Sequence, residues 1–225
     1  MSLKQSVQSA LNRDSVLYRI LASVYRHRSP HSLKRAVTMR WQKDSRFDAT
    51  ELWMASFCPT RILDTLLAEW NPKSFLDIGC GTGMAMYYLS QKGIECVGLE
   101  GSTAAIESSP VKQHIHCVNL NRAVNLGRTF DLVWSHEVAE HIHPRFVENF
   151  LDTLTGHGEL LAMSAARPGQ GGQGHFNEQP PEYWINKLWS RNFVFQKSFT
   201  EYLRGVEESF SANMLVFRRD SSKAA

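Results

Sequence analysis

Hydrophobic residues near the N-terminus recur every three or four positions, which is the spacing of one face of an amphipathic helix. They are Val16, Leu17, Ile20, Leu21, Val24 and Tyr25, with arginines between and after them, and Ser29-Pro30 ends the run. This pattern predicts a basic amphipathic helix. Such a helix either lies on a membrane surface, as a peripheral contact, or packs its apolar stripe on the rest of the chain or on a second subunit.

The pattern changes along the rest of the chain. A second helical stretch runs from about Ala49 to Trp70 and is stopped by Asn71-Pro72, because the residue before a proline disfavours helical backbone. From Ser74 onward, short apolar runs alternate with helical segments, which is typical of β-α-β units and a mostly parallel sheet. The predicted strands are Ser74–Ile78, Glu95–Leu99, Ile115–Val118, Asp131–Ser135, Glu159–Ser164, Val194–Phe199 and Met214–Phe217. We therefore expect an α/β fold with seven strands, helices on both faces of the sheet and an N-terminal helical extension.

The most specific motif follows the first predicted strand. Asp77 is followed by Gly79, Gly81 and Gly83 at alternating positions, and a helix is predicted from Met84 to Gln91. Glycines at such a turn let the backbone bend sharply and approach a ligand closely. A dinucleotide fingerprint needs glycine or alanine three residues after its second glycine, where this chain has methionine, and this argues against NAD and FAD. An acid before the first glycine instead fits a cationic amino acid joined to a nucleoside.

The next two strands supply further candidates for nucleoside binding. Glu100 ends the second strand about 20 residues after the glycine turn, where an acid accepts hydrogen bonds from both ribose hydroxyls. Asn119 follows the third strand, where an amide side chain can contact the adenine edge. The residues expected at the cofactor are Asp77, Gly79, Cys80, Gly81, Gly83, Glu100, Gly101, Asn119 and Ser135.

With these motifs the chain resembles the class I S-adenosylmethionine-dependent methyltransferases, in particular the group that contains ubiquinone-type and sugar O-methyltransferases. The resemblance covers roughly residues 50–220. It implies a Rossmann-like sheet whose seventh strand runs antiparallel between the fifth and the sixth, with S-adenosylmethionine as methyl donor. This chain departs from many relatives in having Asn119 where aspartate is frequent.

Titratable residues cluster after the fourth and fifth predicted strands, where ligands of open α/β sheets bind. Glu137, Glu140 and His141 would share one face of a helix that begins at the end of the fourth strand. Their pattern, with His175 after the fifth strand, resembles the metal-assisted 2′-O-methyltransferases of small RNAs, in which the metal holds vicinal hydroxyls of the acceptor. Two interpretations stay open: these four residues bind Mg²⁺ or Mn²⁺, or they brace the loop and supply a general base, His141 or His175, with Glu140 beside it.

Composition changes this picture in three ways. Residues 1–46 carry ten Lys or Arg against two acids, a net charge of +8, whereas the rest of the chain carries −5. This basic arm is suited to nucleic acid, to an anionic membrane surface or to an acidic substrate. No apolar run approaches the roughly 20 residues of a transmembrane segment, no signal peptide is recognisable, and four scattered cysteines indicate reduced thiols, so we expect a cytoplasmic protein.

The sequence thus predicts a basic N-terminal extension over residues 1–48, a methyltransferase domain over 49–220 and a tail over 221–225. The glycine-rich stretch from Pro168 to Gly174 is predicted to be an active-site loop. The leading hypothesis is O-methylation of a small metabolite, lipid or sugar. The alternatives are an RNA methyltransferase that uses the basic arm and a non-catalytic domain that binds S-adenosylmethionine only as a ligand.

Overall fold

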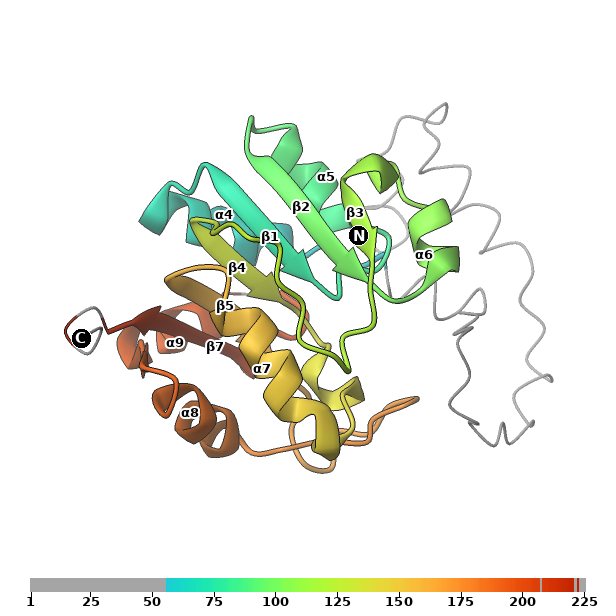
Figure 1. Ribbon diagram of the computed structural model, residues 1–225. Coiled ribbons are helices and arrows are strands. Elements are labelled where there is room, and N and C mark those ends of the chain that lie inside the picture. The colour runs from blue at the N-terminus through green and yellow to red at the C-terminus, as the bar shows by residue number, and fades with distance from the viewer. Residues whose placement is uncertain (1–55, 207, 221, 223–225) are drawn as a thin grey trace, which may run out of the picture.

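The computed structural model describes residues 56–206, 208–220 and 222, and within them one seven-stranded sheet carries the fold (Figure 1). The strands are β1 Ser74–Ile78, β2 Glu95–Glu100, β3 Ile115–Cys117, β4 Leu132–Ser135, β5 Leu160–Ser164, β6 Phe193–Phe195 and β7 Met214–Arg219. Their order in the sheet is β3-β2-β1-β4-β5-β7-β6. All neighbours pair in parallel except β7, which is antiparallel to both β5 and β6. The Rossmann-like fold and the place of the seventh strand are confirmed.

Helices cover both faces of this sheet (Figure 1). One core packs under α7 Val147–Thr155 and α8 Pro181–Trp189. The other packs under α4 Thr60–Trp70, α5 Met84–Ser90 and α9 Lys197–Arg204. The short helix α6 Thr103–Glu107 follows β2, and 3-10 turns lie at Lys112–His114, Ala139–His141, Pro144–Phe146 and Ser211–Asn213. Among the described residues, every helix is too short or too polar to cross a bilayer.

The side chains of the central strands alternate between the two cores, as the pleat requires. Phe75 and Trp134 face α4 and α5, whereas Leu76 and Val133 face α7. All four are buried, and burying one such side chain contributes roughly 1.5–3 kcal/mol. These strands are apolar on both faces because helices cover both sides of the sheet.

Three expectations from the sequence need correction. The predicted strand Val194–Phe199 ends at Phe195, and α9 begins at Lys197, because Phe199 and Leu203 recur at helical spacing. The helix predicted from about Ala49 begins, within the described residues, at Thr60 after Pro59. In the described chain no α-helix begins directly at the end of β4: Glu137 has a left-handed φ of 53°, a 3-10 turn follows over Ala139–His141, and the next α-helix, α7, begins only at Val147.

The predicted basic helix near residues 16–28, and the whole proposed extension over 1–48, lie outside the described residues.

Candidate functional site

The carboxyl ends of β1, β2, β4 and β5 lie at one edge of the sheet, because these strands run in parallel. The start of β7 reaches the same edge, since Met214 pairs with Ser164 at the end of β5. The residues that follow β1, β2, β4 and β5, and those that precede β7, therefore lie together at this edge. Ligands of open α/β sheets bind at this edge.

The glycine turn after β1 has the conformation that its sequence predicts. Gly79, Gly81 and Gly83 have φ angles of 79°, 55° and 70°, a region that residues with a Cβ rarely adopt. The backbone N–H groups of Gly79 and Cys80 donate to the carbonyl of Leu99 at 2.8 and 3.1 Å. The turn is thus bound to β2, and it leads into the first turn of α5.

Glu100 at the end of β2 organises this turn. One carboxylate oxygen accepts from the N–H of Gly81 at 2.8 Å, and the other accepts from Gly101 and Ser102 at 2.7 Å each. Burial raises the pKa of Glu100, and these three backbone hydrogen bonds act in the opposite direction. Because an ionised carboxylate offers about four acceptor sites, one is left for a ligand after these three bonds.

Asp77 lies next to Glu100 and is 3% exposed. Burial, and secondarily the charge of Glu100, raise the pKa of Asp77 to about 8. A carboxyl with this pKa is mostly protonated at neutral pH, and a cationic ligand beside it would favour its ionised form. This observation fits S-adenosylmethionine, which carries a sulfonium and an ammonium group, better than an anionic dinucleotide.

The remaining expected cofactor residues lie at or after the ends of β2, β3 and β4. Ser135 is buried at the end of β4, and its hydroxyl donates to the carbonyl of Ile78 at 2.8 Å, which joins β4 to β1. Asn119 is exposed after β3, and its side-chain oxygen accepts from the N–H of Asn121 at 3.0 Å. Gly101 lies against the chain that leaves β3, because a Cβ there would be 3.2 Å from the carbonyl oxygen of Val118.

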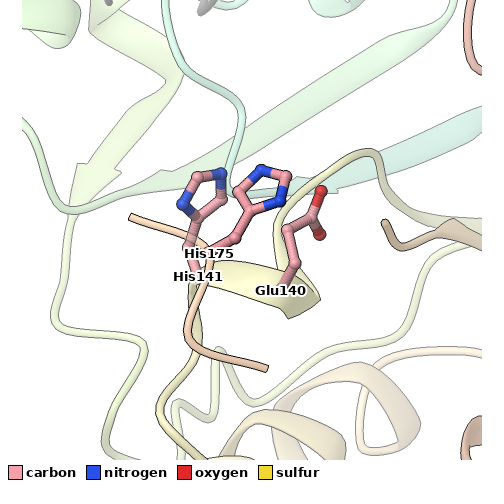
Figure 2. A group of neighbouring side chains, drawn as sticks. All are labelled: Glu140, His141 and His175. Atoms are coloured by element: carbon pink, nitrogen blue, oxygen red, sulfur yellow. The ribbon is translucent and has the colours of Figure 1, made fainter. Parts of the chain in front are cut away.

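A second group lies after β4 and β5. Glu140, His141 and His175 each offer a ligand atom, and these atoms lie within 4.8 Å of one another. Figure 2 shows the carboxylate of Glu140 beside the ring of His175, with the ring of His141 on the other side. The two imidazole rings meet edge to face with their centroids 4.9 Å apart. His175, which lies 34 positions after His141 in the sequence, is thus brought beside His141 and Glu140.

Glu140 is the most unusual residue of this group. Its side chain is completely buried, and neither carboxylate oxygen has a hydrogen-bond partner in the described structure. Burial, and secondarily the charge of Glu137, raise the pKa of Glu140 to about 8. An unpartnered buried carboxylate is costly unless it is protonated or bound to a cation.

Both histidines are oriented through Nδ1. Nδ1 of His141 lies 3.1 Å from the carbonyl oxygen of Gly174, so it carries the proton and leaves a lone pair on Nε2. Burial, and secondarily the charge of His175, lower the pKa of His141 to about 4, so the ring is neutral at physiological pH. Nδ1 of His175 lies 2.8 Å from Glu178, which holds that ring in the same way.

Glu178 also organises the glycine-rich loop between Pro168 and Gly174. Its carboxylate accepts from the N–H groups of Gly169 and Gly171 at 2.9 and 2.7 Å. The same loop covers His175, because a Cβ at Gly172 would come within 2.3 Å of its Nε2. The loop is therefore tied to the second group of residues, as the prediction of an active-site loop requires.

Glu137 is not one of the three clustered side chains, although it lies close enough to Glu140 for its charge to raise the pKa of that carboxyl. Its carboxylate accepts from the amide of Asn213 at 3.1 and 3.3 Å, and its own N–H donates to Ser164. Sequence reasoning did not single out Asn213 or Glu178. Glu178 has a local signal, a carboxylate three residues after a candidate histidine, whereas Asn213 comes from the far end of the chain without one.

Aromatic rings form one wall of this edge. His136 stacks on Trp134 with centroids 5.3 Å apart and on Phe57 at 5.7 Å. Phe210 meets the His136 ring edge to face at 6.0 Å. Burial lowers the pKa of His136 to about 3, so this ring is neutral and serves as part of an apolar surface.

Comparison with known proteins agrees with this geometry. The sequence model of a family described as "Methyltransferase domain" matches residues 51–168, more than half of the chain. The chain is similar to the chloroplastic tocopherol O-methyltransferase of Arabidopsis thaliana, with 30% identity over 109 residues, 43% of this chain and 31% of that protein. A probable tocopherol O-methyltransferase of Oryza sativa subsp. japonica is 33% identical over 85 residues, 33% of this chain and 24% of that protein. The chain thus matches at most about a third of the length of these relatives.

Solved structures share the fold at low sequence identity. The plantazolicin methyltransferase BpumL, in complex with a pentazolic desmethylPZN analog and SAH, has a TM-score of 0.52 and 13% identity, covering 72% of this chain and 85% of that one. The methyltransferase domain of the bacterial protein CtHen1-CN has a TM-score of 0.52 and 18% identity, covering 74% and 99%. At this level of identity the likeness concerns the fold.

Proposed function

Since the chain belongs to the methyltransferase-domain family and is a class I S-adenosylmethionine-dependent methyltransferase, we propose that it methylates a hydroxyl oxygen of a small molecule. We further propose that Glu140, His141 and His175 hold a divalent cation beside this hydroxyl, with Glu137 next to them. The cofactor residues at the glycine turn and these residues occupy the same edge of the sheet.

The observation that carries the cation proposal is the buried, unpartnered carboxylate of Glu140. A cation at this position would replace the proton that the raised pKa otherwise keeps on Glu140. The donor set of carboxylate oxygen and imidazole nitrogen suits Mn²⁺ better than Mg²⁺, which prefers oxygen ligands alone. Glu178 behind His175, and the Gly174 carbonyl behind His141, are the outer partners that metal-binding histidines usually have.

The alternative role, general base, fits His141 less well, and His175 stays the other candidate for it. A general base works best when its pKa is near the working pH. His141, with a pKa of about 4, is a weak base at neutral pH but a competent ligand, because its imidazole needs no deprotonation before it binds a cation. His141 is therefore assigned to cation binding.

The chemistry divides between the two groups of residues. Bound S-adenosylmethionine supplies a methyl group that is already activated by its sulfonium. A bound cation would lower the pKa of the acceptor hydroxyl, so that its proton is released to solvent water. The oxygen then forms a bond to the methyl carbon as the carbon–sulfur bond breaks, and S-adenosylhomocysteine leaves. The side chains of the protein position the two reactants. Glu100 and the glycine turn hold the nucleoside, whereas Glu178 orients His175 and Asn213 orients Glu137. The aromatic wall around His136 keeps water away from the reacting groups.

The names of the curated relatives support oxygen as the methylated atom, since both are O-methyltransferases. The aromatic wall supports a small acceptor with an apolar part. RNA is the alternative acceptor. The basic arm on which RNA binding or membrane contact would depend lies outside the described residues. We also propose, from the sequence alone, that the protein is cytoplasmic.

A labelling experiment tests the proposal. The protein is incubated with methyl-labelled S-adenosylmethionine and either a small-molecule extract or total RNA, with Mn²⁺ or with excess chelator. We expect label in the small-molecule fraction, loss of that label with chelator, and a loss of at least about a hundredfold in Glu140→Gln. Label confined to RNA would overturn the acceptor class. Labelling that is undiminished by chelator would overturn the cation.

A further inference from the structure

Two arginines converge near the start of β7. Arg167 lies three residues after β5, and one of its terminal nitrogens donates to the carbonyl of Ala212. Arg204 is the last residue of α9, and its Nε donates to the carbonyl of Met214 at 3.0 Å. Ala212 and Met214 flank Asn213, so both guanidinium groups are fixed next to the residue that holds Glu137.

Neither guanidinium has its full set of partners. Nε of Arg167 and one terminal nitrogen of Arg204 are buried without a hydrogen-bond acceptor. Neither arginine forms an ion pair in the part of the chain that the structure describes. Other arginines, such as Arg128 and Arg191, do pair with carboxylates. Two neighbouring cations with buried, unused donors are a costly arrangement unless an anion binds them.

The electrostatics agree with this geometry. Burial, and secondarily the charge of Arg167, lower the pKa of Arg204. Glu201 and Glu182 raise the pKa of Arg204, each by less than Arg167 lowers it. An anion bound between Arg167 and Arg204 would therefore be stabilised by both positive charges.

Hydrogen bonds connect this pair to the proposed acceptor site. The N–H of Arg167 donates to the side-chain oxygen of Gln170 at 3.2 Å, and the amide of Asn213 donates to the same oxygen at 3.0 Å. That amide also donates to Glu137, which lies beside Glu140. The two arginines and the residues proposed to hold the acceptor are thus joined through Gln170 and Asn213.

We propose that Arg167 and Arg204 form an oxyanion subsite that binds a phosphate or carboxylate group of the acceptor. The planar guanidinium presents paired donors that match either group. This proposal rests on the proposed function in one respect: the molecule that carries the oxyanion is taken to be the methyl acceptor. The binding of an oxyanion itself depends on neither turnover nor the cation.

The test measures oxyanion binding by thermal unfolding of the full chain, saturated with S-adenosylhomocysteine and kept in chelator. Inorganic phosphate or acetate replaces chloride at constant ionic strength. We expect phosphate, acetate or both to raise the melting temperature in a saturable way. Arg204→Gln should weaken the apparent affinity at least about tenfold, and Arg204→Lys, which keeps the charge but loses the fork, should weaken it less. Arg128→Gln, the same change at an exposed ion pair, should leave it unaltered.

Phosphate stabilisation alone would identify a phosphorylated acceptor, whereas acetate stabilisation would identify a carboxylate. Stabilisation that is equal in wild type and Arg204→Gln, or absent in wild type, would overturn the subsite. If Arg204→Gln does not fold, Arg204→Lys and Arg167→Gln decide in its place. The labelled product from the small-molecule extract should also bind an anion-exchange resin. A neutral product would overturn the link to the acceptor even if the oxyanion binds.

Discussion

The carboxylate of Glu100 has one role that the structure shows, in the glycine turn, and one that is predicted, at the nucleoside. Its place at the end of a strand predicts a contact with the ribose, and the structure adds three backbone hydrogen bonds that bind the glycine turn to the end of β2. Sequence spacing predicts the ribose contact but not the hydrogen bonds to the turn, because these depend on how closely Gly81 approaches the carboxylate. The same residue therefore shapes the site and is positioned to contact the ligand.

Glu100→Gln should weaken binding of S-adenosylhomocysteine by about 10- to 100-fold, since charge-assisted hydrogen bonds contribute roughly 1.5–3 kcal/mol. Calorimetry measures the affinity, and urea unfolding shows how much stability is lost with the bonds to the turn. Glu107→Gln on the exposed helix α6 is the matched control and should bind normally. Affinity within twofold of wild type in Glu100→Gln would contradict the assignment.

Other residues of the site could be predicted only in part. Glu140, His141 and His175 are found from their spacing and side-chain chemistry, and the structure brings them together. Glu137 belongs to the same sequence pattern, but its left-handed backbone turns it toward Asn213. The sequence gives no sign of that partner, because the contact is made by residues 76 positions apart.

At the scale of elements, the turn after β1 and the turn after β4 form one packed unit. A Cβ on Gly79 would lie 2.5 Å from a methyl group of Val138, which sits between Glu137 and the 3-10 turn Ala139–His141. The glycine at this position therefore serves packing between the two turns as well as backbone conformation.

Gly79→Ala should destabilise the protein by about 2 kcal/mol or more, because it adds a steric clash to the strain of a positive φ. Gly93→Ala is the matched control: its φ of 78° is similar, but nothing lies within 4 Å of the added Cβ, so about 1 kcal/mol of strain is expected. Urea unfolding compares the two. Equal losses of unfolding free energy in Gly79→Ala and Gly93→Ala would show that the contact with Val138 does not affect stability.

The elements themselves were predictable where hydrophobic periodicity was unambiguous. The strands β1, β2, β5 and β7 are apolar runs bounded by polar residues, and each is found within two residues of its predicted bounds. The prediction of a strand over Val194–Phe199 was wrong beyond Phe195, because a short run with two phenylalanines fits both a strand and the first turn of a helix. Only the packing of Leu203 against the core separates the two.

At the scale of the whole molecule, the fold places every proposed cofactor contact at Asp77 or later. Deletion of residues 1–48, the proposed N-terminal extension, should leave binding of S-adenosylhomocysteine within about twofold of wild type. A deletion through residue 58 is the contrasting variant, because it removes Ser56, which is bonded to Thr82 in the glycine turn, and Phe57, which stacks on His136. Calorimetry of both proteins checks this. Loss of binding in the shorter deletion would place the extension in the cofactor site.

The central claim, that Glu140, His141 and His175 bind a divalent cation, is tested most directly by calorimetric titration of Mn²⁺ at pH 7 in two buffers of different ionisation enthalpy. We predict one site and release of about one proton, because Glu140, with its pKa raised to about 8, is protonated at pH 7 and must ionise to bind, whereas neutral His141 releases none. The affinity should rise with pH up to about 8 and then level off. Glu140→Gln should abolish binding, and Glu69→Gln on the exposed side of α4 should not. Binding without proton release, or binding of equal strength in Glu140→Gln, would contradict the account.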